Sequence, residues 1–265
     1  MGELGGKVVI VTGGGGQIGS AVATRMAEAG AKVMLTDEND EALAKTCATL
    51  RGGGAEAAKF HGRIDDKLDA SNLMAATIDA FDRIDVLVNI PRATLPGAFA
   101  ELSGGSLSEA LTQNVVSSFL LGQAVAKRMI ELNEGNEGAG GAILNMSSIA
   151  ARRTVPELLA YSVSCAALDQ LTRSMAADLA PHGIRVNGVA LGAVMSERLR
   201  VAMRERDDLR GELVRVTPLG RIGEAEEAAD VACFLASGRA SFLTGQIVTV
   251  DGGRSVLDPL ASPVR

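Results

Sequence analysis

Glycines concentrate in one short segment near the start of the chain. The segment Thr12–Gly19 reads Thr-Gly-Gly-Gly-Gly-Gln-Ile-Gly, and it lies between a β-branched apolar run, Lys7–Thr12, and a helical pattern, Gln17–Ala29. Glycines allow a tight turn and let the backbone approach a diphosphate, which the N-terminus of a helix stabilises. Any turn can collect glycines, so the segment alone is a weak signal. Its position between a strand and a helix predicts a dinucleotide-binding site.

Asp37 strengthens this prediction. It follows a second apolar run, Lys32–Thr36, and lies 18 residues beyond Gly19. A carboxylate at that place can accept hydrogen bonds from the adenosine ribose hydroxyls, and it would repel a 2′-phosphate. Neither neighbour, Thr36 or Glu38, is an arginine that would reverse this preference. We therefore expect NAD rather than NADP as the cofactor.

The elements that would position these residues alternate along the chain, short apolar runs being separated by helical patterns. The expected strands are Lys7–Thr12, Lys32–Thr36, Ile84–Asn89, Ala142–Met146, Ile184–Val189 and Ile247–Val250, and the expected helices are Gln17–Ala29, Asp40–Arg51, Leu107–Leu132, Pro156–Leu179 and Ala225–Ala236. This pattern predicts an α/β fold, a three-layer doubly wound parallel sheet of the Rossmann-like type. We expect residues 1–265 to form a single domain, with a surface loop at Glu134–Gly141 and a surface tail after Gly253.

The composition argues against several classes of protein. Lys and Arg number 26 against 32 Asp and Glu, a net charge of −6 that is unlike that of a nucleic-acid-binding protein. No uncharged apolar run approaches the roughly 18 residues of a membrane span, and the first residues lack the pattern of a signal peptide. Cys47, Cys165 and Cys233 lie far apart, so neither a disulfide framework nor a zinc site is expected. We expect a cytoplasmic protein that binds no metal, nucleic acid or membrane.

Further motifs follow the glycine-rich turn. They are Asp85-Val86-Leu87-Val88-Asn89, Asn114 in Asn-Val-Val-Ser, Asn145-Met146-Ser147-Ser148, Tyr161 at 13 residues beyond Ser148, Ala180–Asn187 and Phe242–Gly253. In this order they resemble the short-chain dehydrogenase/reductase family, over a stretch from about Gly5 to Gly253. Tyr161, the only tyrosine of the chain, stands at the place of the family's tyrosine.

The resemblance implies roles for Asn114, Ser148 and Tyr161. In the family, the tyrosine is the general acid/base at a carbinol or carbonyl oxygen, the serine hydrogen-bonds the same oxygen, and the asparagine holds a water in the proton relay. Cofactor contacts are implied at Gly13, Gly15, Gly16, Gln17, Ile18, Gly19, Asp37, Ile64, Asn89, Gly192, Val194 and Ser196. A homotetramer is implied as well, assembled through the two long helices at Leu107–Leu132 and Pro156–Leu179 and through the last strand.

Cys165 departs from the family pattern, because it stands where the resemblance implies a catalytic lysine. That lysine holds the nicotinamide ribose and lowers the pKa of the tyrosine. A cation about 5 Å away, at an effective dielectric near 20, changes a pKa by roughly two units. Without it, the pKa of Tyr161 is expected nearer its ordinary value of about 10. The other interpretation is that Cys165 is simply a small side chain buried on a helix.

Other departures surround the same cleft. Asn89-Ile90-Pro91-Arg92 replaces Asn-Asn-Ala-Gly, Gln17 replaces a glycine, Leu191-Gly192 replaces Pro-Gly, Arg63-Ile64 replaces an Asp-Val pair near adenine, and Ser196 replaces a threonine that contacts the carboxamide. Arg92 is a candidate to replace the missing cation, and a solvated loop arginine is the more ordinary interpretation. Arg152 and Arg153 are candidates to select an anionic substrate, and for them too an exposed loop arginine is the more ordinary interpretation.

Two functions remain open. The first is an oxidoreductase that transfers a hydride between NAD(H) and a secondary alcohol or ketone. The second is a catalytically impaired homologue that acts as a dinucleotide-binding or structural subunit. The segment Met195–Thr217, which lines the substrate cleft in the family, is unusually charged, and its sequence does not identify the substrate.

Overall fold

The computed structural model describes residues 2–90, 94–134 and 140–256. Within them the strands form one parallel sheet of seven strands, in the order β3-β2-β1-β4-β5-β6-β7. The strands are β1 (Val8–Thr12), β2 (Lys32–Asp37), β3 (Ala57–His61), β4 (Val86–Asn89), β5 (Gly141–Ser148), β6 (Ile184–Leu191) and β7 (Ile247–Val250). The predicted doubly wound sheet is confirmed.

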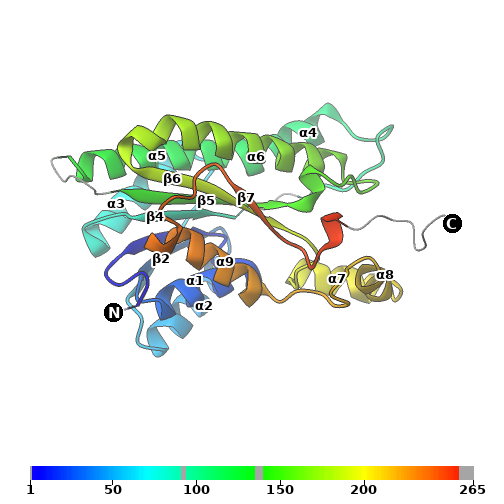
Figure 1. Ribbon diagram of the computed structural model, residues 1–265, viewed down its shortest axis with the longest axis horizontal. Coiled ribbons are helices and arrows are strands. Elements are labelled where there is room, and N and C mark those ends of the chain that lie inside the picture. The colour runs from blue at the N-terminus through cyan, green and yellow to red at the C-terminus, as the bar shows by residue number, and fades with distance from the viewer. Residues whose placement is uncertain (1, 91–93, 135–139, 257–265) are drawn as a thin grey trace.

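Helices connect the strands and cover both faces of the sheet. They are α1 (Gln17–Glu28), α2 (Asp40–Gly52), α3 (Lys67–Phe81), α4 (Gly104–Leu111), α5 (Ser117–Leu132), α6 (Leu159–Leu179), α7 (Glu197–Glu205), α8 (Leu209–Arg215) and α9 (Ala225–Ala236). Figure 1 shows α1, α2 and α9 below the sheet and α5 and α6 above it, and α3 packs beside α5 on that same face. No helix in the described ranges is both long enough and apolar enough to cross a membrane.

Alternate residues of the central strand β1 explain the two layers. Val9 and Val11 pack with α1, α2 and α9, whereas Ile10 points to the other face and packs with α3, α5 and α6. All of these strand residues are completely buried. A strand that is buried on both faces has a continuous apolar sequence, and the apolar run at Lys7–Thr12 therefore predicted β1.

The observed elements differ from the predicted ones where the apolar signal is weak. The strand β3 was not predicted, because its exposed Lys59 and His61 interrupt the apolar pattern at the edge of the sheet. The predicted helix over 107–132 is interrupted by a π-helical turn, Thr112–Val116. The predicted helix over 156–179 begins three residues later, at Leu159. The predicted loop at 134–141 and the tail after Gly253 lie mostly outside the described residues.

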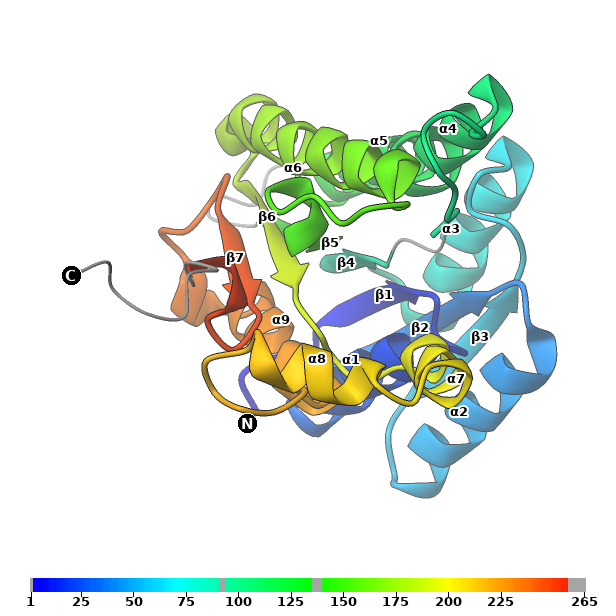
Figure 2. The same ribbon diagram turned by 90° about the vertical axis from the view of Figure 1, so that its right-hand side faces the viewer.

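The strand order brings the predicted site residues to one edge. The chain runs from β1 outward to β3 and then returns to β4 on the other side of β1, so the connections after β1 and β4 diverge. Ligands of open α/β sheets bind in the crevice at such a reversal, beyond the carboxyl ends of the strands. The ends of β1, β4, β5 and β6 all lie there, and α7 and α8, which follow β6, extend beyond them (Figure 2).

Candidate active site

A cleft of about 530 Å³ opens at the carboxyl ends of the central strands. Most of the predicted site residues line it, namely Gly13, Gly16, Gln17, Ile18, Gly19, Asp37, Ser148, Tyr161, Gly192, Val194 and Ser196. The cleft therefore unites the predicted dinucleotide site with the predicted catalytic residues. Gly15, Ile64, Asn89, Asn114 and Cys165 are not among the residues that line it, and Arg92 lies outside the described residues.

The glycine-rich turn brings the start of α1 against the end of β1. Gly13 has a φ of 64°, a conformation that glycine adopts easily. A Cβ on Gly19 would lie 2.0 Å from the carbonyl oxygen of Gly13, so only a glycine allows this approach. The amide N–H of Gly16 donates to the same oxygen at 3.0 Å. The N-terminus of α1 is consequently held at the cleft.

Asp37 closes one end of the cleft. Its carboxylate accepts hydrogen bonds from the backbone N–H of Gly15 at 3.0 Å and of Asn39 at 2.9 Å. Each carboxylate oxygen has further lone pairs, so these bonds leave capacity for additional donors. Gly15 therefore does not line the cleft itself, and its N–H orients the Asp37 carboxylate. Arg63, at the place of the family's Asp-Val pair, forms a two-point ion pair with Asp65.

Asn89 lies beneath the cleft. Its side-chain amide donates to Asn145 Oδ1 at 2.9 Å, and Asn145 in turn donates to Thr172 Oγ1 at 2.9 Å. All three residues are completely buried. This ladder ties β4, β5 and α6 together, so the side chain of Asn89 has a structural role. Ile64 packs with the apolar cluster around α3 instead of lining the cleft.

Tyr161 lies in the first turn of α6, opposite Ser148 at the end of β5. The Ser148 hydroxyl donates to the Leu191 carbonyl at 3.3 Å and accepts from the Ala150 N–H at 3.1 Å, which fixes its position. Burial raises the pKa of Tyr161 above its ordinary value, and Cys165 acts in the same direction. Hydrogen bonding with Ser148 and the charge of Arg198 oppose them without reversing the shift.

This result corrects one expectation from the sequence. From the missing lysine alone, we expected the pKa of Tyr161 near its ordinary value. The structure raises this pKa, because partial burial of the phenol disfavours its ionised form. The tyrosine is thus protonated at neutral pH.

Cys165 lies one turn after Tyr161 on α6 and is 1% exposed. Burial, with the nearby Asp169 carboxylate, raises the pKa of its thiol to about 12. The side chain is therefore a neutral thiol at pH 7, and it supplies no positive charge to Tyr161. The burial of Cys165 agrees with its interpretation as a small buried side chain, whereas its interpretation as the replacement of a catalytic lysine stays a prediction from the sequence.

Asn114 lies in the π-helical turn that precedes α5. Its amide donates to Ser164 Oγ at 2.9 Å, and Ser164 donates to the backbone carbonyl of Tyr161 at 2.8 Å. π-Helical turns inside helices are frequent at functional sites, because the extra residue redirects one side chain. Here the turn directs Asn114 toward the first turn of α6.

Seven further residues of the cleft wall were not among the predicted site residues. They are Ile90, Thr94, Met146, Ser147, Leu191, Glu197 and Arg198. All but Thr94 lie in segments that the sequence analysis had placed at the cleft or in a motif. The unusual charge of the segment Met195–Thr217 was the available signal for Glu197 and Arg198. Arg152 lies 3.9 Å from Asp169, and Arg153 donates to the carbonyl of Ser255, so neither is among the residues that line the cleft.

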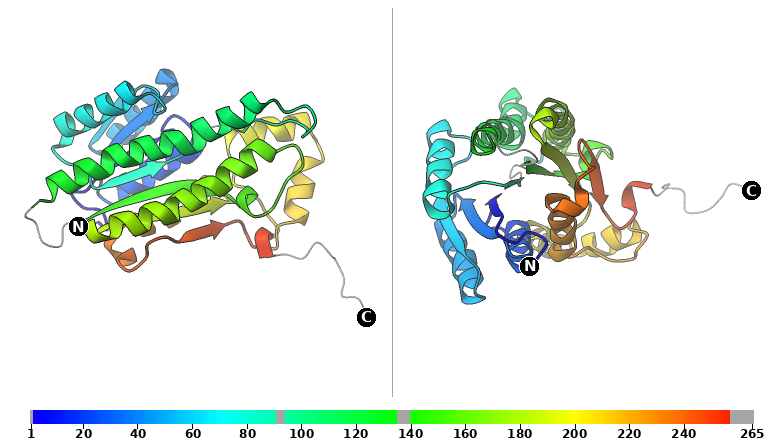
Figure 3. Two further views of the ribbon diagram at one scale, coloured as in Figure 1. Left: turned by 90° about the horizontal axis from the view of Figure 1, so that it is seen from above. Right: turned by 60° about the vertical axis from the view of Figure 1, so that its left-hand side comes forward.

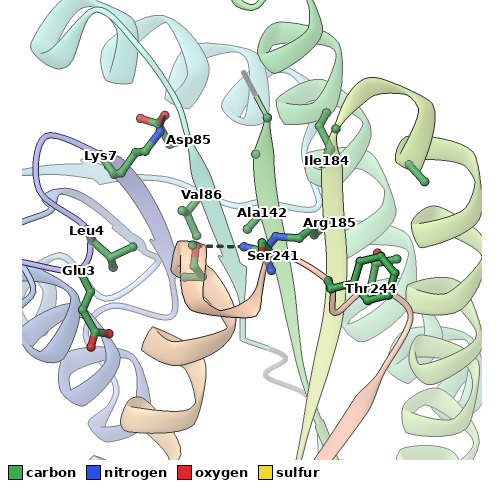
Figure 4. A pocket seen from close by; sticks show the side chains of 17 residues that line it. Glu3, Leu4, Lys7, Asp85, Val86, Ala142, Ile184, Arg185, Ser241 and Thr244 are labelled. Carbon is green, nitrogen blue, oxygen red and sulfur yellow. Dashed lines mark hydrogen bonds and ion pairs between the residues drawn. The ribbon is translucent and has the colours of Figure 1, made fainter. Parts of the chain in front are cut away.

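A second cavity, of about 630 Å³, lies at the opposite edge of the sheet (Figure 4). Lys7 donates to Asp85 at 3.0 Å, and the Arg185 guanidinium donates to the carbonyls of Leu235, Ala236 and Ser237 at the end of α9. Burial lowers the pKa of Arg185. The Lys7–Asp85 pair joins the starts of β1 and β4, and Arg185 joins β6 to the end of α9, so this cavity has the character of a structural joint. Within the described residues, no group of three His, Cys, Asp or Glu side chains could hold a metal ion.

Asp169 offers a test of the electrostatics below the cleft. It is 3% exposed, and burial raises its pKa despite Ser147, Arg152 and Arg173. A raised pKa in the folded state means that stability is greatest below the unfolded pKa and falls as the pH rises through the folded pKa. Asp169→Asn should therefore raise the melting temperature at pH 8 by about 2–4 °C, the shift that about 1 kcal/mol gives a chain of this size.

Melting curves between pH 4 and pH 8 check this expectation. The gain of Asp169→Asn should shrink toward pH 4, where Asp169 itself becomes neutral. The exposed Asp207→Asn serves as the control and should show no such pH-dependent gain. An equal gain at every pH would mean that the amide packs better and that charge plays no part.

Known proteins share this arrangement. Residues 15–255 match the family model described as enoyl-(acyl carrier protein) reductase. The chain is 38% identical over 256 residues to a 2,5-dichloro-2,5-cyclohexadiene-1,4-diol dehydrogenase of Sphingobium indicum, covering 96% of this chain and 98% of that one. It is 34% identical over 251 residues to the 7alpha-hydroxysteroid dehydrogenase of Escherichia coli, covering 95% of each.

A solved structure agrees with these sequence matches. A 7 alpha-hydroxysteroid dehydrogenase complexed with NADH and 7-oxo glycochenodeoxycholic acid superimposes with a TM-score of 0.88 at 34% identity, over 94% of both chains. The similarity thus extends over nearly the whole chain, in sequence and in fold. The chain belongs to the short-chain dehydrogenase/reductase family of oxidoreductases.

Proposed function

We propose that the protein transfers a hydride between NAD(H) and a secondary alcohol or ketone. The observation that carries this proposal is the cleft itself, in which Tyr161 and Ser148 face the glycine-rich turn and Asp37. The free thiols of Cys47, Cys165 and Cys233 support a cytoplasmic, reducing location.

The residues of the cleft fit NAD. Gly13, Gly16 and Gly19 leave the N-terminus of α1 open to a diphosphate, and Asp37 has lone pairs for ribose hydroxyls. The Oε1 atom of Gln17 is buried with no hydrogen-bond partner among the described residues, although the side chain lines the cleft. A bound dinucleotide or its water would satisfy that atom. When bound, the nicotinamide ring supplies or accepts the hydride.

Tyr161 would move the proton at the substrate oxygen, which Ser148 would orient. A protonated tyrosine donates, so the raised pKa of Tyr161 favours reduction of a carbonyl at neutral pH. The reverse reaction needs the ionised form as a base, and it should increase toward alkaline pH. Asn114, through Ser164, would hold the first turn of α6 in the orientation that this transfer needs.

The second candidate function is a dinucleotide-binding or structural subunit with impaired catalysis. Cys165 favours it, because a neutral, buried thiol occupies the position of the family's lysine. NADH binding without turnover would support a binding subunit, and absence of binding would support a structural one. Calorimetric titration with NADH, followed by a screen of ketones, separates these functions.

Cofactor choice tests the role of Asp37. NADH should bind about tenfold or more tightly than NADPH, because the carboxylate repels a 2′-phosphate. Asp37→Asn keeps a hydrogen-bond acceptor but loses the charge, so it should shrink this preference. Calorimetric titration of both cofactors into both proteins measures it. Equal or tighter binding of NADPH by the unaltered protein would contradict the assignment of NAD.

Substitution at Cys165 tests the missing cation. Cys165→Lys should lower the pKa of Tyr161 by about two units and raise turnover at neutral pH, because a cation stabilises the phenolate. The chain has one tyrosine and no tryptophan, so the near-ultraviolet absorbance of tyrosinate reports Tyr161 alone. The titration requires no substrate, and circular dichroism defines the pH range in which the protein stays folded.

Cys165→Met is the matched control, since methionine has a similar reach and no charge. It should leave the pKa of Tyr161 raised. If Cys165→Lys and Cys165→Met give the same titration curve, an added charge at this position does not govern Tyr161.

We also propose a homotetramer that buries the outer faces of α5 and α6. Figure 3 shows these two long helices side by side on one face of the sheet, in green and yellow-green. Val116, Phe119 and Val163 are each 42–44% exposed there, in a stripe with the small residues Ala166 and Ala167. An apolar stripe that the monomer leaves uncovered is suited to an isologous contact.

Light scattering at micromolar concentration tests this assembly. The expected mass is four times 27.3 kDa. Phe119→Glu should reduce it, because a buried carboxylate at a symmetric contact would meet its own copy. A monomer of the unaltered protein would contradict the proposal.

A further inference from the structure

Arg198 lies at the substrate end of the cleft. It is the second residue of α7, two residues after the helix-capping residue Ser196, whose hydroxyl accepts the N–H of Leu199 at 3.2 Å. The guanidinium of Arg198 hydrogen-bonds the hydroxyl of Thr94, which lies in the connection after β4. Arg198 and Thr94 line the same cavity as Tyr161 and Ser148. The side chain thus bridges two walls of the cleft beside the proposed reaction centre.

The charge of Arg198 reaches that centre. It lowers the pKa of Tyr161, although burial outweighs it. The hydroxyl of Tyr161 marks the place of the reacting oxygen, so a positive charge lies next to the bound substrate. The N-terminus of α7, which also points positive partial charge outward, is at the same place.

The neighbouring arginines of α7 do not share this placement. Glu197 is the charged side chain next to Arg198 among the described residues of the cleft wall. Arg200 and Arg204 pair with Glu197 at 3.5 and 3.1 Å and so offset its charge. Arg152 and Arg153, the arginines that the sequence suggested for an anion, have their contacts at Asp169 and Ser255. The positive charge that the described residues turn toward the substrate is that of Arg198.

We propose that Arg198 binds a carboxylate of the substrate, so that the substrate is an oxo acid or the corresponding hydroxy acid. This inference rests on the proposed function and names its substrate class. A guanidinium can hold a carboxylate through two parallel hydrogen bonds, which orients the ligand as well as binding it. A bound carboxylate also offsets the charge of Arg198 and keeps Tyr161 protonated, the state that reduction of the oxo group needs.

The cofactor diphosphate is the competing partner for Arg198. The glycine-rich turn and the start of α1 already form an anion site for that group. Arg198 contacts Thr94 and acts on Tyr161, so its position favours the substrate. Binding measurements with NADH alone distinguish the two, because only a diphosphate contact would weaken NADH binding when Arg198 is replaced.

The experiment compares the unaltered protein with Arg198→Met, Arg198→Lys and Arg200→Met. The last is the matched control, an arginine of the same helix that pairs with Glu197. Calorimetry first measures NADH binding to each protein. The NADH complexes are then titrated with 2-oxobutanoate, acetoacetate and levulinate, and with their uncharged methyl esters, and KM and kcat are determined for those that turn over.

At least one acid should bind more tightly than its ester. Arg198→Met should weaken its binding and raise its KM by about 10- to 100-fold, the range of a charge-assisted contact, and should leave its ester unchanged. Arg198→Lys should recover part of the loss, since lysine keeps the charge without the two-point geometry. Arg200→Met should behave as the unaltered protein, and NADH binding should stay within about twofold in all four proteins.

Three results would overturn this inference. They are equal binding of acids and esters, no binding of any of the three acids to the NADH complex, and a loss of NADH affinity in Arg198→Met. The first two results can occur with normal NADH binding. They would leave the proposed cofactor and the proposed hydride transfer intact. If the unaltered protein binds no NADH, the proposed function itself fails, and the substrate class fails with it.

Discussion

The close approach of α1 to the end of β1 is the contact on which the site depends. Because Gly19 has no side chain, the first turn of the helix can lie against the carbonyl of Gly13, and the helix N-terminus then faces the cleft. Any Cβ at this position would meet the backbone itself, which cannot rotate away as a side chain can. Asp37, at the end of β2, accepts the N–H of Gly15 in the same glycine-rich turn. The end of the cleft formed by the glycine-rich turn and Asp37 follows from this packing.

Two groups on α6 illustrate how little of an active site is set by residue identity alone. Tyr161 and Cys165 are one helical turn apart, and burial raises the pKa of both; Cys165 raises the pKa of Tyr161 further, whereas the hydrogen bond of Tyr161 lowers the pKa of the Cys165 thiol without reversing its shift. A lysine at the second position would reverse the sign of that coupling. With a thiol there, the charges on the cleft wall come from elements that are far away in the sequence, of which α7 is one.

Sequence patterns predicted the parts of the molecule in which spacing determines position. The glycine-rich turn, Asp37, Ser148 and Tyr161 lie at strand ends or on helix starts, and a parallel sheet places such ends at one edge. The pattern could not say how deeply each side chain is buried. The side chain of Asn89, which the sequence analysis placed among the cofactor contacts, joins Asn145 in a buried ladder, and burial that no motif records raises the pKa of Tyr161. The edge strand β3 and the polar helix α7 were missed because neither carries a continuous apolar run.

The strand order also has a consequence for how the chain acquires its fold. The central strand β1 has β2 on one side and β4 on the other, and β4 begins about 75 residues after β1. During synthesis the second edge of β1, with its completely buried valines and isoleucine, has no partner until that whole stretch has been made. Pairings of such long sequence separation form slowly, since their loop entropy is lost before any contact is gained. The centre of the sheet, and with it the crevice that depends on β4, is among the last parts of the first half of the chain to become ordered.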